Sequence, residues 1–445
     1  MAGYYGFGNA GDEAILASLL DDIRAELPDV SVTVTSADVD ATSALHDVAA
    51  VHWTDIEALT RSVRHSDVAV LGGGGIFHDW SPFDLDLTLS RHHTGVAYYL
   101  TVPLLAAALQ RPLALCGVGV GPLRSAEAQR ATLAAFESAN AATLRDEESR
   151  RVLARLGADL TSVSVAADPA FRLRQASRAH ALQWIEAQLG TVPERPLLVV
   201  SLRPWTADGP EDRWTSEVAS AIDGFVERQG AFVLFVPLQE YPDSAVSDRR
   251  VMERVRSRME NAKRSAIVDA PLDPRLTAAV IGTADLVLGM RLHSVIFAAT
   301  AGVPVVALAY DRKVTSVMDV LGMADGSVPM RSLSSNQLSL ALIQMWDRRA
   351  PLVDRLASSV DALRRRAEDN PAALHSVLAE ATPARLGPRS SELLRQVALG
   401  RARDAYRLEL EKERLVADYG TLASTSAARP TATPLAPCSW TAPSA

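Results

Sequence analysis

The chain has 445 residues, which is enough for two domains with substantial hydrophobic cores. Its net charge of −8 argues against a nucleic-acid partner bound over the whole surface. No stretch is long, apolar and free of charge enough to cross a bilayer, and no charged-then-apolar signal sequence stands at the amino end. We therefore expect a cytoplasmic protein. Cys116 lies in an apolar run and Cys438 in the tail, which argues against a disulfide framework or a cysteine metal site.

The first part of the chain alternates helical and strand patterns. Residues 12–27 have one apolar helical face, and strands are predicted at 30–34, 67–71, 112–116, 140–144 and 162–166. Such alternation is typical of parallel βαβ units, so we predict a doubly wound, Rossmann-like domain over residues 1–173. A domain of this kind normally opens with a strand, but here Met1-Ala2 leads at once into a glycine-rich loop. We expect either that the start of the chain has been placed too late or that the first strand is reduced to a few residues.

After a polar, helix-prone linker at 174–194 the alternation begins again. Strands are predicted at 196–202, 231–236, 265–269, 284–289 and 303–309, and helices at 212–228, 243–260, 274–283, 293–301 and 313–321. The pattern indicates a second Rossmann-like domain over residues 195–350, with a ligand cleft between the two domains. Residues 351–420 form a predicted helical extension, and the Ala/Ser/Thr/Pro-rich residues 421–445 a predicted disordered tail.

The segment Gly289-Met290-Arg291-Leu292-His293 joins an apolar strand directly to an apolar helix. In an open parallel sheet, ligands bind outside the carboxyl ends of the strands. Arg291 brings a permanent forked cation to that edge, and His293 a group that exchanges protons near neutral pH. A helix-capping or core histidine is the alternative for His293, but its place beside Arg291 at a strand end favours a functional role. The pair indicates an anionic substrate that undergoes proton transfer.

Arg203 ends an earlier strand of the same sheet, so Arg203 and Arg291 are placed to approach one anion from two strand ends. Nearly every cation in this chain is arginine, so an arginine by itself is weak evidence for a binding site. The alternative is that both are surface arginines, and only their position at strand ends favours anion binding. Tyr310-Asp311-Arg312-Lys313 follows another strand and either adds charge to the site or forms a solvated turn.

The glycine-rich loop at residues 3–11 stands directly before a helix. Free amides at a helix start bind anions or hydroxyls, but the carboxylates of Asp12 and Glu13 in the first turn disfavour a bound phosphate. Two interpretations fit equally well: a tight structural turn, or a sugar-binding loop in which Asn9, Asp12 and Glu13 contact hydroxyls.

A second glycine run, Gly72-Gly73-Gly74-Gly75, stands at a predicted strand end. Close helix–strand packing is one explanation, but four glycines exceed what packing needs, so we predict that Gly73 and Gly74 expose amides to a ligand. Asp79 is predicted to reach the cleft. The glycines of 117–121 form a third glycine-rich segment, after the next predicted strand. For Arg145-Asp146-Glu147-Glu148-Ser149, we favour helix capping and a structural salt bridge.

These blocks together resemble the polysaccharide pyruvyl transferase family, which includes CsaB-like cell-wall enzymes. The resemblance covers roughly residues 3–330 in the family's order. Its blocks are GYYGFGNAGDEAIL (3–16), LGGGGIFHD (71–79), GVGVGP (117–122), RDEES (145–149), ADPAF (167–171), SLRP (201–204) and GMRLHSVIFAATAGVPVVALAYDRKV (289–314).

The resemblance implies a GT-B-like architecture of two Rossmann-like domains. It implies transfer of pyruvate from phosphoenolpyruvate, as co-substrate, onto two hydroxyls of a sugar in a cell-surface polymer, with a ketal formed and phosphate released. Phosphoenolpyruvate would be held by Arg203, Arg291, Leu292 and His293. His293 is the expected general acid/base, with Asp12, Glu13 or Asp79 as partner base. No metal or other cofactor is expected, and no nucleic-acid partner.

The main alternative is a nucleotide-sugar glycosyltransferase of the same architecture, which would use Arg203 and Arg291 on a diphosphate. A non-enzymatic sugar-binding or scaffold protein is the other. The family also suggests a lipid-linked acceptor at the inner face of the plasma membrane. The arginine-rich helical segment 389–416 fits peripheral contact with an anionic membrane, but its glutamates favour a packed or solvated helix. The sequence leaves the oligomeric state open.

Overall fold

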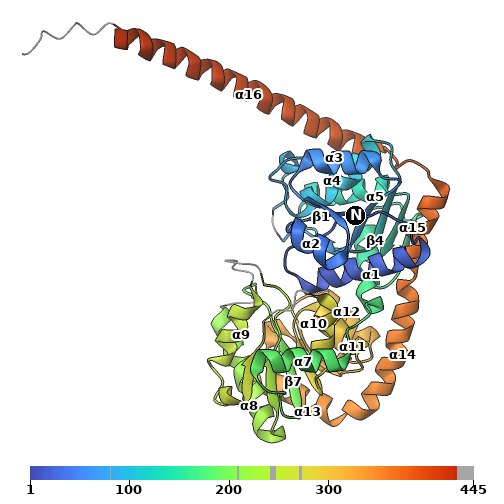
Figure 1. Cartoon of the computed structure of the whole chain (residues 1–445), viewed down its shortest axis with the longest axis vertical. Helices are drawn as coiled ribbons and strands as arrows, with labels where there is room; N and C mark the ends of the chain where they lie inside the picture. The colour runs from blue at the N-terminus through green and yellow to red at the C-terminus, as the bar shows by residue number, and fades with distance from the viewer. Residues whose placement is uncertain (81, 208–209, 241–246, 270–272, 428–445) are drawn as a thin grey trace, which may run out of the picture. The chain divides into compact units, whose positions relative to one another are not determined.

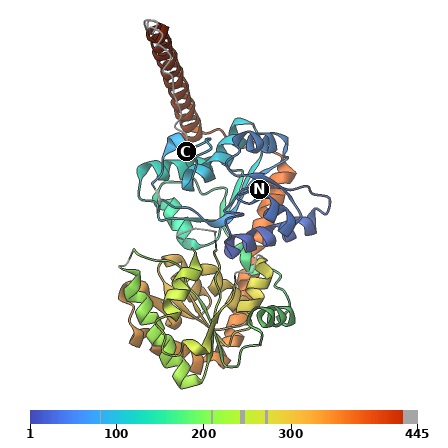
Figure 2. The same ribbon diagram turned by 60° about the vertical axis from the view of Figure 1, so that its left-hand side comes forward.

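The computed structural model describes residues 1–80, 82–207, 210–240, 247–269 and 273–427. Residues 1–393 form one compact unit and residues 394–445 a second. Within the first unit, parallel sheets and helices build two Rossmann-like halves (Figures 1 and 2). We call them the N-lobe, which carries β1–β6, and the C-lobe, which carries β7–β12. The α/β fold with two doubly wound halves is thereby confirmed.

The N-lobe holds a four-stranded parallel sheet in the order β3-β4-β5-β6 and a separate parallel pair, β1-β2. Its strands are β1 (Thr33–Ser36), β2 (Ala49–His52), β3 (Ala69–Phe77), β4 (Leu113–Val120), β5 (Ala141–Leu144) and β6 (Val163–Val165). Its helices are α1 (Ala10–Glu26), α2 (Val39–His46), α3 (Ile56–His65), α4 (Gly95–Ala108), α5 (Ala126–Ser138) and α6 (Glu147–Arg155). The short strand β2 has no counterpart among the predicted elements.

Strands β3 and β4 are longer than predicted, because both continue through their glycines. The predicted strands stopped at residues 71 and 116, whereas the ladder pairs Gly74 with Val118 and Gly75 with Gly119. A Cβ on Gly73 would lie 2.6 Å from the carbonyl oxygen of Gly117. Small residues therefore let the two strands stay paired, and Gly73 serves this packing.

The chain begins between β1 and β3 and hydrogen-bonds to both. The amide of Ala2 donates to the carbonyl of Val70 at 2.8 Å, and the amide of Thr35 donates to the carbonyl of Met1 at 2.9 Å. Ala2 also forms a parallel bridge with Leu71. Met1 and Ala2 thus lie between the edges of β1 and β3.

The linker contains α7 (Arg178–Leu189), and the C-lobe follows with a six-stranded parallel sheet in the order β12-β11-β10-β7-β8-β9. Its strands are β7 (Leu197–Ser201), β8 (Phe232–Phe235), β9 (Ser265–Ile267), β10 (Leu286–Gly289), β11 (Val305–Ala309) and β12 (Ser327–Pro329). Its helices are α8 (Glu211–Gln229), α9 (Asp248–Arg256), α10 (Pro274–Ile281), α11 (Leu292–Thr300), α12 (Arg312–Val320) and α13 (Ser335–Asp347). The strand order reverses between β7 and β10, and such switch points hold ligands.

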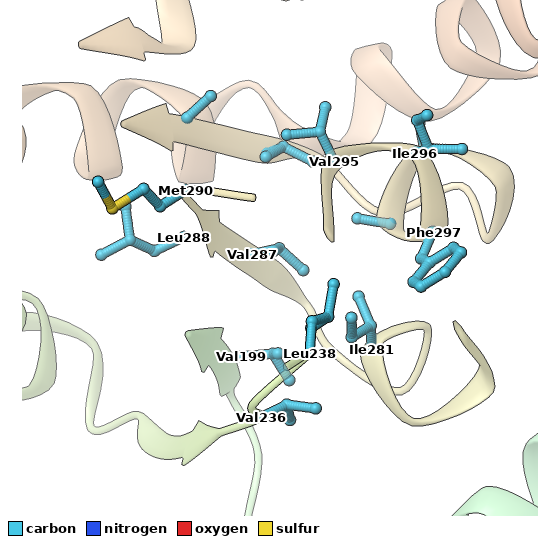
Figure 3. Close-up of a cluster of buried hydrophobic side chains, with 14 of the residues drawn as sticks. Val199, Val236, Leu238, Ile281, Val287, Leu288, Met290, Val295, Ile296 and Phe297 are labelled. Atoms are coloured by element: carbon cyan, nitrogen blue, oxygen red, sulfur yellow. The ribbon is translucent and has the colours of Figure 1, made fainter. Parts of the chain in front are cut away.

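A buried apolar cluster surrounds β10, one of the two strands at this switch point (Figure 3). Strands covered on both faces by helices need apolar side chains at successive positions, which is why β7 and β10 read as continuous Val/Leu runs. Each fully buried Val, Leu or Phe contributes roughly 1.5–3 kcal/mol of transfer free energy. Its members include Val199, Val236, Leu238, Ile281, Val287, Leu288, Met290, Val295, Ile296 and Phe297.

Two carboxy-terminal helices return to the N-lobe. Helix α14 (Arg349–Ala367) packs against α11 and against the N-lobe turn Pro169–Arg172, and α15 (Asp369–Glu380) packs against β4 and β5. The amide of Asn370 accepts a hydrogen bond from the Thr143 hydroxyl and donates to the carbonyl of Ala167 at 3.0 Å. Part of the predicted helical extension therefore completes the first unit.

The described part of the second unit is helical. Helix α16 (Pro388–Ala427) carries the chain past the predicted start of the tail at residue 421, and residues 428–445 of that tail lie outside the described residues. Among the helices that the structure describes, none is long and apolar enough to span a membrane.

Candidate active site

His293 lies in the first turn of α11 and faces the N-lobe. Its Nε2 is 3.7 Å from Oδ2 of Asp168, which belongs to the segment after β6. Asp168 is held in place because its Oδ1 accepts the amide of Ala170 at 3.0 Å. Gly11, at the start of α1, lies so close to the imidazole that a Cβ there would overlap Nδ1. The histidine is thus enclosed by N-lobe residues and only 8% exposed.

Asp12 follows Gly11 and lies in the same buried neighbourhood as His293 and Asp168. Burial raises the pKa of Asp12 from 3.8 to about 6, a shift that His293 and Arg145 counteract and that Asp168 increases. Space for the carboxylate depends on Gly74, whose φ is +106° and whose added Cβ would lie 2.7 Å from Asp12 Oδ1. A carboxyl group that titrates near pH 6 suits acid/base work at neutral pH.

Arg145 follows β5 and lies across the glycine backbone of β3 and β4. A Cβ on Gly119 would lie 2.6 Å from its Nε, and one on Gly75 would lie 2.9 Å from its Nη2 and 3.7 Å from Lys313 Nζ. Its Nη1 is 3.5 Å from Asp168 Oδ2. The side chain, only 6% exposed, thus makes the predicted structural salt bridge and also brings a cation to the cluster.

Arg203, after β7, lies beside Tyr310, after β11. Its Nη1 donates to the Tyr310 hydroxyl at 3.3 Å, and its guanidinium lies 5.0 Å from the centre of the Tyr310 ring. Burial by itself raises the pKa of Tyr310, but Lys313, Arg203 and Arg291 outweigh burial and lower it. These three cations thus make the surroundings of the Tyr310 hydroxyl strongly positive.

Arg291 is bound by Asp248, the first residue of α9. Its Nε and Nη2 donate to the two carboxylate oxygens, each at 2.6 Å, and Asp248 is fully buried. Asp248 Oδ2 also accepts the amides of Leu238 and Gln239, so the pair fixes the segment after β8. Two of the three nitrogens of Arg291 are therefore committed within the protein, and only Nη1 remains for a ligand. Sequence reasoning missed Asp248, which lies in the helix predicted at 243–260.

Buried polar atoms without a hydrogen-bond partner gather at the carboxyl ends of these strands, within the described part of the chain. Leaving such an atom unsatisfied costs about 1–3 kcal/mol, so a cluster of them points to a ligand site. The atoms are His78 Nδ1 and Asp79 Oδ1 after β3, Arg145 Nε, Asp168 Oδ2, Ser201 Oγ at the end of β7, Arg203 Nε and His293 Nε2. They come from both lobes.

Other predicted site residues make structural contacts. Glu13 accepts the amide of Gly6 at 2.7 Å and pairs with His46 at 2.8 Å, which fastens the glycine-rich loop. Asn9 caps α1 by accepting the amide of Gly11 at 3.0 Å. The loop therefore has the features of a tight structural turn, and hydroxyl recognition by these two side chains stays a prediction.

Asp79 and Leu292 are similarly engaged. Asp79 Oδ2 accepts the amides of Arg124 and Ser125, each at 2.6 Å, which fixes the loop after β4. Leu292 is 6% exposed and packs in the main apolar core. A substrate contact by either residue stays a prediction.

A family model described as polysaccharide pyruvyl transferase matches residues 9–312, which include this whole cluster. The chain belongs to this family. The chain is also similar to the amylovoran biosynthesis protein AmsJ of Erwinia amylovora. The two are 21% identical over 397 residues, which cover 82% of this chain and 95% of AmsJ. The sequence resemblance to the pyruvyl transferases is thereby confirmed.

Solved structures similar to this pyruvyl transferase family member show the fold. The UDP-GlcNAc 2-epimerase of Neisseria meningitidis bound to UDP-GlcNAc has a TM-score of 0.57 at 10% identity, covering 85% of this chain and 100% of that one. HepE of Anabaena in complex with UDP-glucose has a TM-score of 0.56 at 13% identity, covering 85% and 98%. The likeness confirms the predicted GT-B-type architecture.

Beside the cluster, aromatic side chains from both lobes of the pyruvyl transferase fold meet. Trp80, after β3, is 42% exposed, and its ring centre lies 6.1 Å from that of Trp205 in an edge-to-face arrangement. Trp205 in turn lies 4.9 Å from Tyr310, and Arg124 lies 4.9 Å over the Trp80 ring. We call Trp80, Trp205 and Tyr310 the aromatic row. Within the described residues, no group of three or more His, Cys, Asp or Glu is arranged to hold a metal ion.

Proposed function

We propose that this protein transfers pyruvate from phosphoenolpyruvate onto two hydroxyls of a sugar in a cell-wall or surface polysaccharide, forming a ketal and releasing phosphate. The observation that carries the proposal is the buried His293–Asp168 pair beside Arg145. Lys313 lies near Arg145, and Arg203 and Lys313 both lie near Tyr310. The membership of the chain in the polysaccharide pyruvyl transferase family supports the same reaction.

Phosphoenolpyruvate carries a carboxylate and a phosphate, both of which suit planar, forked guanidinium groups. Arg203 and Arg145 each have a buried Nε without a hydrogen-bond partner. Lys313 lies near Arg145 and Tyr310 and adds a point charge. We assign the anion mainly to these three residues, with Arg291 contributing its remaining Nη1 and the charge that it shares with Tyr310.

His293 is the proposed general acid. It donates a proton to the methylene carbon, C3, of phosphoenolpyruvate, which leaves an oxocarbenium-like centre at C2. One sugar hydroxyl adds to C2 and loses its proton to a base. The bond between C2 and the phosphate oxygen then breaks, phosphate leaves with the electron pair, and a second hydroxyl adds and loses its proton to close the ketal. General acid/base catalysis of this kind contributes about 10² to 10⁴-fold.

Asp12 is the proposed base, since its raised pKa of about 6 lets it accept a hydroxyl proton and release it near neutral pH. Asp168 is proposed to orient the imidazole of His293 and to stabilise its protonated form. The aromatic row lies next to Arg203, and apolar sugar faces pack well on Trp and Tyr rings, so we assign the acceptor to this side. The acceptor is a sugar or a lipid-linked polysaccharide precursor.

Phosphate release tests the reaction. The full-length protein is incubated with phosphoenolpyruvate, with a pyruvylatable sugar acceptor, and with both. We expect phosphate only when both are present, together with a product heavier than the acceptor by the mass of the ketal group. Phosphate release without an acceptor, or no release with any acceptor, would contradict the proposal.

A nucleotide-sugar glycosyltransferase is the second candidate, because the neighbouring folds were solved with UDP or UDP-sugars. In that case Arg203 and Arg291 would bind a diphosphate. Turnover of a UDP- or GDP-sugar in the absence of phosphoenolpyruvate would favour this candidate and refute pyruvyl transfer.

A further inference from the structure

The short segment after β6 carries Asp168, and the carboxy-terminal helices hold its backbone. The carbonyl of Ala166 accepts a hydrogen bond from Nη2 of Arg366 in α14 at 3.0 Å. The next carbonyl, that of Ala167, accepts one from Nδ2 of Asn370 in α15, also at 3.0 Å. The two peptide carbonyls directly before Asp168 are therefore both bound by residues that come much later in the chain.

Asn370 is fully buried and uses both hydrogens of its side-chain amide. Nδ2 also donates to the carbonyl of Ala367 at 2.9 Å, and Oδ1 accepts the hydroxyl of Thr143 in β5 at 2.5 Å. The Thr143 oxygen in turn accepts the amide of Gly117 in β4 at 2.7 Å. An amide supplies the two donors and the acceptor that this position uses, which neither a carboxylate nor an apolar side chain does. A buried network with its members paired holds its surroundings rigidly.

Thr143 connects this network to a second residue of the candidate active site. It lies two positions before Arg145, whose Nη1 is 3.5 Å from Asp168 Oδ2. Asn370 thus binds both chain segments that meet at this carboxylate, the one that carries Asp168 and the one that carries Arg145. Its amide therefore fixes the two segments relative to each other.

The position of Asp168 matters because two cationic partners share one of its oxygens. His293 Nε2 lies 3.7 Å from Oδ2, and Arg145 Nη1 lies 3.5 Å from the same atom. Arginine carries a permanent charge, so a carboxylate that is free to move is drawn towards Arg145 and away from His293. A displacement of about 1 Å in a catalytic arrangement can lower a rate by about 10²-fold. The backbone that carries Asp168 therefore decides how strongly its charge acts on His293.

We propose that Asn370 is a positioning residue that keeps Asp168 within reach of His293. It does so by holding the carbonyl of Ala167 on one side and the hydroxyl of Thr143 on the other. The inference rests on the proposed function, which assigns Asp168 to orient and stabilise a proton-transferring His293. It gives the carboxy-terminal extension a part in the reaction, because α15 then supports the active site as well as the core.

An NMR titration of the His293 imidazole tests the proposal without any substrate. The charged groups around this imidazole include Asp12 of α1, Asp168 and Arg145 from the N-lobe, and Arg291 directly before α11. Asn370→Ala should move the titration midpoint to lower pH by about half a pH unit or more, because less negative charge then stabilises the imidazolium. In the Asp168→Asn background, Asn370→Ala should add no further shift. A midpoint that Asn370→Ala leaves in place, or moves equally in both backgrounds, would overturn the proposal.

Phosphate-release kinetics supply a second readout. Asn370→Ala should lower kcat about tenfold or more and leave the KM for phosphoenolpyruvate nearly unchanged, and the double variant should be no slower than Asp168→Asn alone. Asn140→Ala is the matched control: its Nδ2 donates to the carbonyls of Thr382 and Pro383, so it also joins the N-lobe to the carboxy-terminal extension, but at the amino end of β5. It should keep the wild-type kcat. Equal losses in the two variants would show a general effect of loosened packing and overturn the proposal.

Thr143 offers a milder pair of variants in case Asn370→Ala does not fold. Thr143→Val removes the hydroxyl that anchors Asn370 and keeps the shape, so it should move the titration midpoint and kcat in the same directions. Thr143→Ser keeps the hydroxyl and should restore both. Wild-type behaviour of Thr143→Val would overturn the proposal. If the wild-type protein releases no phosphate, the proposed function fails, and the NMR titration still decides whether Asn370 positions Asp168.

Discussion

His293 Nε2 and Asp168 Oδ2 lie 3.7 Å apart across the two lobes, and neither atom has another hydrogen-bond partner. The distance is that of an ion pair, somewhat too long for a hydrogen bond. Arg145 approaches the same carboxylate oxygen at 3.5 Å, and this cation and His293 hold the pKa of Asp168 below its usual value although burial opposes them. Asp168 therefore stays ionised and is available to stabilise a protonated His293.

Asp168→Asn should lower kcat about 100-fold or more with a small effect on the KM for phosphoenolpyruvate, because the amide keeps the shape but loses the charge. Steady-state kinetics across pH measure this. The alkaline limb of the kcat/KM profile should also move to lower pH, which a purely structural role would not cause. An unchanged profile with wild-type kcat would remove Asp168 from the mechanism.

His293→Ala should abolish turnover and leave phosphoenolpyruvate binding largely intact, since the anion is assigned to Arg145, Arg203 and Lys313. Binding is measured by calorimetry and turnover by phosphate release. His293→Gln serves as a control for packing, because it fills similar space without a titratable group. Near-normal rates in His293→Ala would show that another group delivers the proton.

Arg203→Ala should impair substrate binding, whereas Arg291→Ala should mainly impair the stability of the fold. Removing Arg203 should weaken phosphoenolpyruvate binding at least tenfold with little change in the free energy of unfolding. Removing Arg291 leaves Asp248 buried and unpaired, which should destabilise the fold by about 3–5 kcal/mol. Denaturant unfolding combined with binding measurements separates the two effects. A stable Arg291→Ala protein with a pure binding defect would instead make Arg291 a direct ligand residue.

Asp12→Asn should change the pH dependence of stability. With a pKa of about 6 in the folded state and 3.8 in the unfolded state, Asp12 keeps a proton that unfolding releases, so folding stability falls as pH rises from about 4 to 6. The Asn variant lacks this loss and should be more stable than wild type at pH 7, by up to roughly 3 kcal/mol, with the gain fading below pH 4. Denaturant unfolding at several pH values measures it.

The same substitution should also remove the acid limb near pH 6 from the kcat/KM profile, if Asp12 is the base. Loss of stability at pH 7 in Asp12→Asn, or an acid limb that persists in a residual activity, would contradict the assignment.

Trp80→Ala should raise the KM for the sugar acceptor several-fold and leave the KM for phosphoenolpyruvate unchanged, because Trp80 is the exposed end of the aromatic row. Leu340→Ala is a matched control, since Leu340 is an exposed apolar side chain on α13 of the C-lobe. A parallel rise in both KM values would indicate that Trp80 supports the lobes' packing and does not contact the acceptor.

Sequence alone was sufficient for what depends on local pattern. The period of apolar residues predicted most of the helices and strands, and the alternation of strands with helices predicted two parallel sheets. Because strand ends of a parallel sheet share an edge, Arg203, Arg291 and His293 were correctly expected at one edge. The strands β2 and β12 were not predicted, although β6 and β9, which are about as short, were.

The partners of those residues were decided only by the tertiary structure. His293 meets Asp168 because the two lobes pack together. Arg291 meets Asp248 because α9 follows β8, which lies two strands from β10 in the same sheet. Residues so far apart in the chain leave no periodic or spacing signal, so their pairing depends on how whole layers pack.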